Sequence, residues 1–310
     1  MSARLLDGVA VANQIRAEVA PAIAAFTTRV GRPPGLGIVL VGDDPASDIY
    51  VRGKVKAAAE VGIRADAERL PATISLAQLL ELVERLNRSD VHDGILVQSP
   101  LPPALGDDAE RRVFDLVHPD KDVDGFHPIN VGRLVQNRAT LVAGTPSGVI
   151  ELLERSKISI AGTRAVVIGR SDIVGKPVAL LLMHRHATVT ICHSRTVDLA
   201  GVAANADILV AAIGRPGFVT PAFVKPGAAV VDVGTTQVTD RAVVERLFPV
   251  GSKRREAFER RGSIVVGDVH PAVAEVAGAL SPVPGGVGPL TIAMLLKNTL
   301  AAAQLREGST

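Results

Sequence analysis

The sequence has few of the residues on which cysteine chemistry or aromatic recognition depends. It contains one cysteine, Cys192, one tyrosine, Tyr50, and no tryptophan among 310 residues. A single cysteine excludes a disulfide framework and a cysteine-rich zinc site within one chain. Because tryptophan is absent, stacking on a ligand must use Tyr50 or one of the seven phenylalanines.

An excess of charge of either sign is also missing. The chain has 34 Lys and Arg against 32 Asp and Glu, which gives a formal net charge of +2. This balance gives no reason to expect nucleic acid or an anionic membrane as a partner. No apolar run approaches the roughly 18 residues of a membrane span, and the N-terminus lacks the long apolar stretch of a signal peptide. We therefore expect a soluble, cytoplasmic protein.

Short apolar runs and amphipathic stretches alternate along the chain. The short runs, rich in β-branched residues, predict strands at 35–41, 94–97, 164–168, 188–192, 208–213, 229–233 and 264–266. Helical spacing of apolar residues predicts helices at 8–29, 45–61, 75–88, 147–156, 175–187 and 289–306. Because strands alternate with helices, we expect βαβ units, parallel sheets and an α/β protein.

The length of the chain allows one large domain or two ordinary ones. We place a boundary near Thr145-Pro146, so that residues 1–146 form a first domain and residues 147–285 a second. The C-terminal helix, 288–307, is expected to return to the first domain. We interpret the charged segment 251–262 as a solvated surface insertion in the second domain rather than as a basic binding patch.

The second domain opens with the clearest phosphate-binding signal. The strand that ends at Ile168 runs into GRSDIVGKP, residues 169–177, and then into an apolar helix. A glycine turn from a strand into a helix points backbone N–H groups and the helix dipole at a phosphate. The motif departs from G-x-G-x-x-G, because Ser171 replaces the second glycine and Gly175 falls six residues after Gly169. It predicts a Rossmann-like dinucleotide site with a variant turn.

The end of the next strand indicates which dinucleotide binds. NAD-specific sites usually carry an acid about 20 residues beyond the glycines, which holds the ribose 2′-hydroxyl. This chain has His193, Ser194 and Arg195 in that region, and Arg170 in the first turn. A hydroxyl and two guanidinium groups suit a 2′-phosphate, so the sequence favours NADP over NAD.

The candidate chemistry lies in the first domain. Asp44 fits the N-cap and Pro45 the first turn of a helix on which Tyr50 and Lys54 share a face. The tyrosine offers a ring for stacking, and an amine of lowered pKa can act as acid or base. The same pattern also describes a packed tyrosine beside an ordinary surface lysine. Gln98 stands at the carboxyl end of another predicted strand.

A run of aspartates, Asp120, Asp122 and Asp124, follows in the sequence. It does not match an EF-hand, because the required downstream Glu is missing. His118 and His127 have the wrong spacing for zinc, and no third ligand is evident. The more economical interpretation is a carboxylate that binds the donor face of a heterocycle, so no metal site is predicted.

Glycine and proline dominate the loop SPVPGGVGPLT, residues 281–291, just before the last predicted helix. Proline fixes φ and glycine allows φ > 0, so the loop specifies a backbone path along which a flat ligand can lie. A rigid connector with Pro289 in the first helical turn fits equally well. Two more strand ends carry glycine turns, one with Gly214 and one with Gly234 and Thr235, and we expect both to line the nicotinamide side.

Together these motifs resemble the bifunctional methylenetetrahydrofolate dehydrogenase/methenyltetrahydrofolate cyclohydrolase family. The resemblance is carried by YVRGK (50–54), DGILVQSPLP (93–102), DKDVDGFHP (120–128), TPSGV (145–149), GRSDIVGKP (169–177) and SPVPGGVGPLT (281–291). They occur in the family's order and cover nearly the whole chain. The resemblance implies oxidation of 5,10-methylenetetrahydrofolate by NADP+ and hydrolysis of the methenyl product to 10-formyltetrahydrofolate. It also implies a homodimer with a catalytic cleft between the two domains.

The resemblance also assigns roles to individual residues. It implies that Lys54 is the catalytic lysine of hydrolysis, that Gln98 accompanies it, and that Tyr50 stacks on the folate. Asp124 would bind the amino and ring N–H groups of the pterin. The loop residues expected to cover the folate are Pro282, Gly285 and Gly286. The residues that match the family's NADP site are Gly169, Arg170, Ser171, Ser194 and Thr235, to which the strand-end argument adds Arg195.

Some positions depart from the family pattern without removing a catalytic residue. Ser99, Ala143-Gly144 and Thr235 replace other residues, and the region between Thr236 and Gly267 is longer than expected. Two alternatives remain. A monofunctional NAD(P)-dependent methylenetetrahydrofolate dehydrogenase is disfavoured by the retention of Lys54. A non-catalytic dinucleotide-binding sensor is disfavoured by the intact set of Tyr50, Lys54, Gln98 and Asp124.

Overall fold

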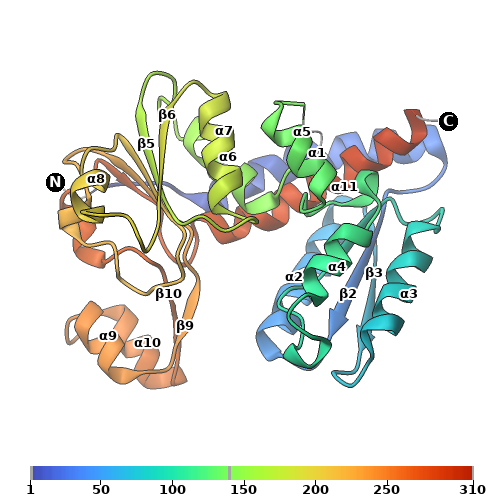
Figure 1. Ribbon diagram of the computed structural model, residues 1–310, viewed down its shortest axis with the longest axis horizontal. Helices are drawn as coiled ribbons and strands as arrows, with labels where there is room; N and C mark the ends of the chain where they lie inside the picture. The colour runs from blue at the N-terminus through green and yellow to red at the C-terminus, as the bar shows by residue number, and fades with distance from the viewer. Residues whose placement is uncertain (1–2, 139–140, 309–310) are drawn as a thin grey trace. The chain divides into compact units, whose positions relative to one another are not determined.

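The computed structural model describes residues 3–138 and 141–308, which divide into two compact units. The three-strand unit comprises residues 12–138, 141–144 and 292–308. The six-strand unit comprises residues 3–11 and 145–291. Two of the three boundaries between them fall within long helices, α1 (Gly8–Val30) and α11 (Val287–Gly308), and the third falls at the start of α6 (Gly144–Arg155) (Figure 1).

The three-strand unit is built on a parallel sheet in the order β3-β2-β4. The strands are β2 (Gly35–Val41), β3 (Arg64–Leu70) and β4 (Gly94–Val97). Its helices, besides its parts of α1 and α11, are α2 (Pro45–Val61), α3 (Leu76–Asn87), α4 (Ala109–Leu116) and α5 (Pro128–Val135). Every residue of β2 and β4 is buried. β2 is the central strand, and a central parallel strand covered by helices favours a continuous apolar run.

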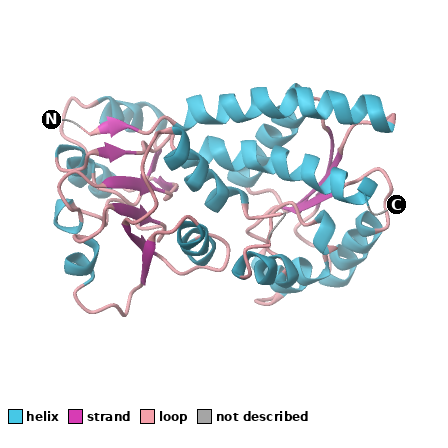
Figure 2. Cartoon of the chain, turned by 90° about the horizontal axis from the view of Figure 1, so that it is seen from above, coloured by secondary structure: helices cyan, strands magenta, loops and turns pink. Residues whose placement is uncertain are grey.

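The six-strand unit is built on a parallel sheet in the order β1-β11-β8-β7-β5-β6. The strands are β1 (Arg4–Leu5), β5 (Arg164–Ile168), β6 (Thr188–Cys192), β7 (Ile208–Ala211), β8 (Ala229–Asp232) and β11 (Ala279–Leu280). Its helices include α6 (Gly144–Arg155), α7 (Gly175–His184) and α8 (Leu199–Ala203). Figure 2 shows the strands of this unit stacked between helices, which is the Rossmann-like arrangement.

The predicted α/β class with parallel sheets is therefore confirmed, and the predicted strands and helices are present with small shifts at their ends. The N-cap prediction for α2 is also correct. Asp44 precedes the helix in an extended conformation, its carboxylate accepts from the backbone N–H of Ser47 at 2.8 Å, and Pro45 is the first helical residue.

The first residues of the chain lie in a different unit from the one that the sequence indicates. The predicted first domain includes residues 1–11, but β1 pairs in parallel with β11 at the edge of the six-stranded sheet. Strand β1 has only two residues, too few for a pattern that predicts a strand, and its partner β11 lies more than 270 residues away in the sequence. The functional assignment of the domains stays a prediction.

The segment between β8 and β11 contains an arm that departs from the predicted parallel sheet. Strand β10 (Ile264–Val266) pairs antiparallel with β9 (Thr236–Val238). The chain between these two strands forms the helices α9 (Arg241–Leu247) and α10 (Lys253–Arg261) (Figure 1). The predicted surface insertion 251–262 thus contains a helix. Phe258 anchors it, because its ring is buried against Val244, Leu247, Ile264 and neighbouring apolar residues. The segment is charged, yet it has a small apolar core.

Strand β3 was not predicted, and its sequence explains why. RADAERL has only exposed and half-buried side chains at the edge of its sheet, and its charged residues form ion pairs, as Glu68 does with Arg85 of α3 at 3.0 Å. Charged residues are common on edge strands because they discourage pairing with other chains. Among the described residues, no helix is both long and apolar enough to cross a membrane.

Candidate active site

Lys54 and Gln98 meet at the carboxyl end of the three-stranded sheet. Gln98 follows β4 directly, and its backbone N–H donates to the carbonyl of Val39 at 2.8 Å, which continues the ladder to β2. Its side-chain Nε2 donates to the carbonyl of Ser99 at 2.5 Å, and this fixes which end of the amide faces outward. Lys54 Nζ, from α2, donates to Gln98 Oε1 at 2.9 Å. The sequence-predicted pair is thus in direct contact.

The environment of Lys54 shifts the pKa of its amine. Burial lowers this pKa, and the nearby negative charge of Asp124 opposes the shift. The same burial raises the pKa of the Asp124 carboxyl to about 6, against the positive charge of Lys54. Two titratable groups with pKa values displaced toward neutrality share one place, an arrangement that is common at catalytic sites.

The segment 120–124 brings Asp124 to this place because it runs alongside β4. A parallel bridge joins Asp122 to Ile95, so the segment follows the strand toward its carboxyl end. The aspartates do not converge on one point. Asp120 pairs with Arg133 at 3.3 Å, whereas Asp122 accepts from the backbone N–H of His127 and from Asn130, both at 2.9 Å. Asp124 alone interacts with Lys54.

Tyr50 lies one helical turn before Lys54 on α2, and its side chain is 49% exposed. A tyrosine in a packed core would be buried, so the packed-tyrosine alternative does not hold. The exposed ring is available for stacking on a planar ligand. Ser99, one of the departures from the family pattern, donates to Glu110, which also accepts from the backbone N–H of Leu101 at 3.0 Å. Sequence reasoning missed this contact, since Glu110 belongs to no motif.

In the six-strand unit, the predicted cofactor and loop residues all follow strands at one edge of the sheet. In sheet order from β6 to β11, the carboxyl ends lead into five segments: 193–195, 169–171, 212–217, 233–235 and 281–286. In parallel sheets this edge is where ligands bind. The predicted residues for the 2′-phosphate, the pyrophosphate, the nicotinamide and the folate loop therefore occur in one spatial series.

The turn after β5 has the conformation that a phosphate loop needs. Gly169 has φ +127°, and a Cβ there would lie 2.2 Å from the carbonyl oxygen of Ala212, so only glycine fits. Ser171 Oγ accepts from the backbone N–H groups of Val174 and Gly175, both at 3.2 Å, and helix α7 starts at Gly175. The compact turn leads directly into a helix N-terminus, which favours an anion.

The remaining predicted cofactor residues are exposed at strand ends. Arg170, Ser194, Arg195 and Thr235 all have exposed side chains. Within the described part of the chain, the guanidinium groups of Arg170 and Arg195 have no hydrogen-bond or ion-pair partner. Because Ile168 pairs with Cys192 in register, the two arginines follow adjacent strand ends. They are free to bind an anionic ligand there.

The glycine-proline loop follows β11. Pro282 and Gly285 are half-buried and Gly286 is buried. A cavity of about 230 Å³ lies beside the loop, and its lining includes Asp232, Gly267, Pro282 and Val283. Burial raises the pKa of the Asp232 carboxyl to about 7. The loop thus borders a cavity in the six-strand unit, next to the carboxyl edge of the sheet.

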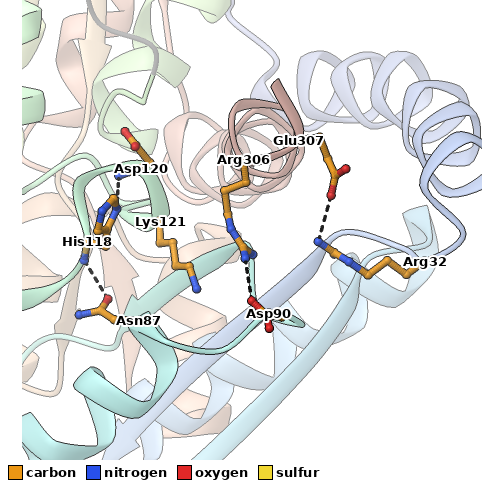
Figure 3. A pocket seen from close by; sticks show the side chains of 8 residues that line it. All are labelled: Arg32, Asn87, Asp90, His118, Asp120, Lys121, Arg306 and Glu307. Atoms are coloured by element: carbon orange, nitrogen blue, oxygen red, sulfur yellow. Dashed lines mark hydrogen bonds and ion pairs between the residues drawn. The ribbon is translucent and has the colours of Figure 1, made fainter. Parts of the chain in front are cut away.

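A second cavity, of about 590 Å³, lies in the three-strand unit (Figure 3). Arg32, Asn87, Asp90, His118, Asp120, Lys121, Arg306 and Glu307 line it. Asp93, fully buried just before β4, accepts from Arg32 at 2.7 Å and from Arg306 at 2.8 Å. This cavity therefore belongs to the amino end of β4, whereas Lys54 contacts Gln98 at the carboxyl end. Its interlocked ion pairs fit a structural role.

Comparison with known proteins gives matches over most of the chain. A family model described as "Tetrahydrofolate dehydrogenase/cyclohydrolase, catalytic domain" matches residues 6–124, and one described as "Tetrahydrofolate dehydrogenase/cyclohydrolase, NAD(P)-binding domain" matches residues 143–307. The "Bifunctional protein FolD" of Koribacter versatilis is 56% identical over 310 residues and covers 100% of both chains. That of Solibacter usitatus is 55% identical over 98% of this chain and 99% of its own.

Among solved structures, the chain is similar to the Trypanosoma brucei methylenetetrahydrofolate dehydrogenase-cyclohydrolase, which was crystallised with NADP and an inhibitor. The two share 41% identity, a TM-score of 0.87 and coverage of 99% of each chain. The bifunctional enzyme from Campylobacter jejuni gives a TM-score of 0.85 at 38% identity, with 98% of this chain and 100% of that chain covered.

Proposed function

The chain belongs to the tetrahydrofolate dehydrogenase/cyclohydrolase family, and we propose that it is a bifunctional one-carbon enzyme. It oxidises 5,10-methylenetetrahydrofolate with NADP+ and hydrolyses the resulting 5,10-methenyltetrahydrofolate to 10-formyltetrahydrofolate. The observation that carries the hydrolytic half is the contact of 2.9 Å between Lys54 Nζ and Gln98 Oε1 beside Asp124. A monofunctional dehydrogenase has no use for this arrangement.

The three-strand unit is proposed to bind the folate. Asp124 is half-buried, and a pKa of about 6 leaves its carboxylate ionised at neutral pH. An ionised carboxylate accepts two hydrogen bonds from the amino and ring N–H groups of a pterin. Tyr50 offers an exposed ring to the flat substrate, and the loop residues Pro282, Gly285 and Gly286 are proposed to cover it.

The six-strand unit is proposed to hold NADP+, and the residues present fit that group. The turn Gly169–Ser171 and the start of α7 provide backbone N–H groups for the pyrophosphate. Ser194, Arg170 and Arg195 provide a hydroxyl and two free guanidinium groups for the 2′-phosphate. Thr235 lies on the nicotinamide side. When bound, NADP+ supplies the hydride acceptor, and the chain's own contribution to this step is to orient and hold the reactants.

Hydrolysis requires a proton transfer that Lys54 is placed to perform. Water adds to the carbon of the methenyl group and gives up one proton. The bond from that carbon to N5 then breaks, the remaining hydroxyl proton is transferred to N5, and the formyl group stays on N10. Lys54 Nζ, with its pKa lowered by burial, exchanges the proton, and Gln98 Oε1 holds the amine in place. Proton transfer by a positioned group of this kind typically contributes about 10²–10⁴-fold.

We also propose a homodimer, which the resemblance implies, and a cytoplasmic location, which the sequence predicts. The solution mass from sedimentation equilibrium tests the first, with twice the 32.3 kDa of one chain expected. The near-neutral charge supports small-molecule partners rather than nucleic acid or a membrane surface.

A coupled absorbance assay tests the proposed function. The purified chain is given 5,10-methylenetetrahydrofolate with either NADP+ or NAD+, and the methenyl product is followed separately. Formation of reduced cofactor and loss of the methenyl compound are both expected. Dehydrogenation without accelerated methenyl hydrolysis would point to a monofunctional dehydrogenase, and NADP+ binding without turnover would point to a sensor.

A further inference from the structure

A buried carboxylate holds the turn after β7. Asp268 is fully buried, and its two carboxylate oxygens accept from three consecutive backbone N–H groups. The donors are Ile213 at 2.7 Å, Gly214 at 3.1 Å and Arg215 at 2.6 Å. In addition, the backbone N–H of Val219 donates to the carbonyl of Asp268 at 2.9 Å. This turn depends on a single residue that lies more than 50 positions away in the sequence.

A second buried carboxylate joins Asp268 to the turn after β8. Asp232, the last residue of β8, accepts from the backbone N–H groups of Asp268 and Val269, both at 2.9 Å, and of Gly234 at 3.0 Å. The turns after β7 and β8 are therefore linked through Asp268 and Asp232. These are the two turns expected to line the nicotinamide side of the cofactor.

The glycines around the two carboxylates show that the space is filled. A Cβ at Gly267 would lie 1.9 Å from Asp232 Oδ2, and a Cβ at Gly234 would lie 2.5 Å from Asp268 Oδ1. The carboxylates thus occupy the volume that side chains would take at these two positions. Gly234, Gly267 and the two aspartates therefore fit together closely, which restricts the backbone conformation of the turns after β7 and β8.

We propose that Asp268 is a positioning residue, which fixes the turn 213–215 so that its backbone is preformed for the nicotinamide end of NADP+. The proposal rests on the proposed function. Three N–H groups that point inward to one carboxylate cannot rotate outward without leaving a buried charge unpaired. The turn is exposed at Gly214 and Arg215. Its conformation is therefore fixed by the hydrogen bonds to the buried Asp268 carboxylate and not by residues packed over its exposed side. A preformed site avoids the cost of ordering the loop when the cofactor binds.

The test compares Asp268→Asn with a change at a carboxylate that lies at the other end of β7 from the turn that Asp268 holds. Asp207 immediately precedes β7 and accepts from the backbone N–H of Arg164 at 2.9 Å, but it lies at the amino edge of the sheet. Asp207→Asn is the control. For each variant the KM for NADP+, the dehydrogenase kcat, the rate of methenyl hydrolysis and the Kd of adenosine 2′,5′-bisphosphate are measured.

For Asp268→Asn we expect the KM for NADP+ to rise about tenfold or more, because an amide cannot accept from all three donors. Methenyl hydrolysis and the Kd of adenosine 2′,5′-bisphosphate, which lacks the nicotinamide, should stay within about twofold of wild type. Asp207→Asn should change none of the four values. An unchanged KM for NADP+ in Asp268→Asn overturns the proposal, as does a parallel loss of all four values.

Hydrogen exchange of the unaltered chain keeps the proposal testable if Asp268→Asn fails to fold. The amides of Ile213 and Arg215 should exchange slowly without NADP+, and addition of NADP+ should change them little. Fast exchange that NADP+ slows would show that the cofactor orders the turn, and would overturn the proposal. Absence of dehydrogenase activity in the wild type would instead count against the proposed function, since the exchange result does not depend on turnover.

Discussion

Two lysines at opposite ends of the three-stranded sheet both have a lowered pKa, but their hydrogen-bond partners differ. Burial lowers the pKa of Lys54, and burial together with the charge of Arg306 lowers that of Lys121 to about 8. Lys121 Nζ donates to the backbone carbonyls of Leu86 at 3.2 Å and Ser89 at 2.7 Å. Lys54 Nζ donates to a side-chain amide at the carboxyl edge of the sheet.

The difference shows that a lowered pKa does not by itself identify a catalytic amine. At Lys121 the surrounding charges at the amino edge of the sheet are bound to one another and to the backbone, as Arg306 is to Asp93 and to the carbonyl of His92. Figure 3 shows Arg306 paired with Asp90 beside Lys121. At Lys54 the neighbours are an exposed tyrosine, an oriented amide and one carboxylate. Structural networks also shift pKa values, so the identity of the partners decides between the two roles.

The largest expected difference between the two lysines is the effect of replacing Lys54 on methenyl hydrolysis. Lys54→Met removes the amine while keeping a similar length, and methenyl hydrolysis should fall by about 10²-fold or more. Hydride transfer should fall less, because it depends mainly on orientation. The rate of loss of the methenyl compound measures the effect. Lys56→Met, two residues along the same helix with an exposed side chain, is the control and should hydrolyse at the wild-type rate.

Lys121 should instead affect stability, and in a pH-dependent way. Its pKa is lowered from 10.5 to about 8 in the folded chain, so the unfolded chain binds the proton more tightly between these values. Stability from this group is therefore fully present above the unfolded pKa and is lost as the pH falls through about 8. The full effect is about 3 kcal/mol.

Urea unfolding of wild type and Lys121→Met, from about pH 7 to about pH 10, measures this contribution. The free energy of unfolding of wild type should rise with pH relative to that of the variant. Parallel curves would show that Lys121 titrates normally. Methenyl hydrolysis by the folded Lys121→Met protein should remain close to wild type, in contrast to Lys54→Met.

Asp124 is the carboxylate beside Lys54, and we propose that it binds the folate, so its replacement tests the function of this end of the sheet. Asp124→Ala should leave the pterin donors unpaired, at a cost of about 1–3 kcal/mol, which is roughly 5–150-fold in kcat/KM for the folate. Both reactions should suffer, while the KM for NADP+ stays nearly unchanged. Steady-state kinetics with each substrate varied in turn measures the two effects. An equal loss of NADP+ affinity would indicate a structural role.

The smallest expected effects are at the cofactor end. Arg170→Ala and Arg195→Ala should each raise the KM for NADP+, by up to about tenfold for an exposed charge-assisted contact, with little change for NAD+. The ratio of kcat/KM for the two cofactors is the measurement. The two contributions need not be equal. Wild-type protein that uses NAD+ as efficiently as NADP+ would refute this assignment.

Local patterns in the sequence predicted much of the fold. The buried runs of β2 and β5, and the Asp44-Pro45 start of α2, are visible because each depends on residues close together in the sequence. Strand β1 and the small apolar core around Phe258 were not predicted, since β1 depends on a distant partner and the core contains one aromatic ring within a charged segment. Edge strand β3 lacks an apolar pattern altogether.

The candidate site shows the same limit. Lys54 and Gln98 were predicted from their motifs, and the structure places them in contact. Their proposed roles stay predictions. Glu110, Asp232 and Asp268 act through backbone N–H groups brought together by the fold, so no spacing rule indicates them. An aspartate beside a glycine at the end of a strand, as at Gly267-Asp268, is the signal that was available.

The partition of product between the two reactions tests the central claim most directly. With 5,10-methylenetetrahydrofolate and NADP+, wild type and Lys121→Met should convert the methenyl compound onward as it forms. Lys54→Met should form reduced cofactor and accumulate the methenyl compound. If Lys54→Met accumulates no more of it than Lys121→Met while forming reduced cofactor at a similar rate, the two lysines do not differ in role and the account is wrong.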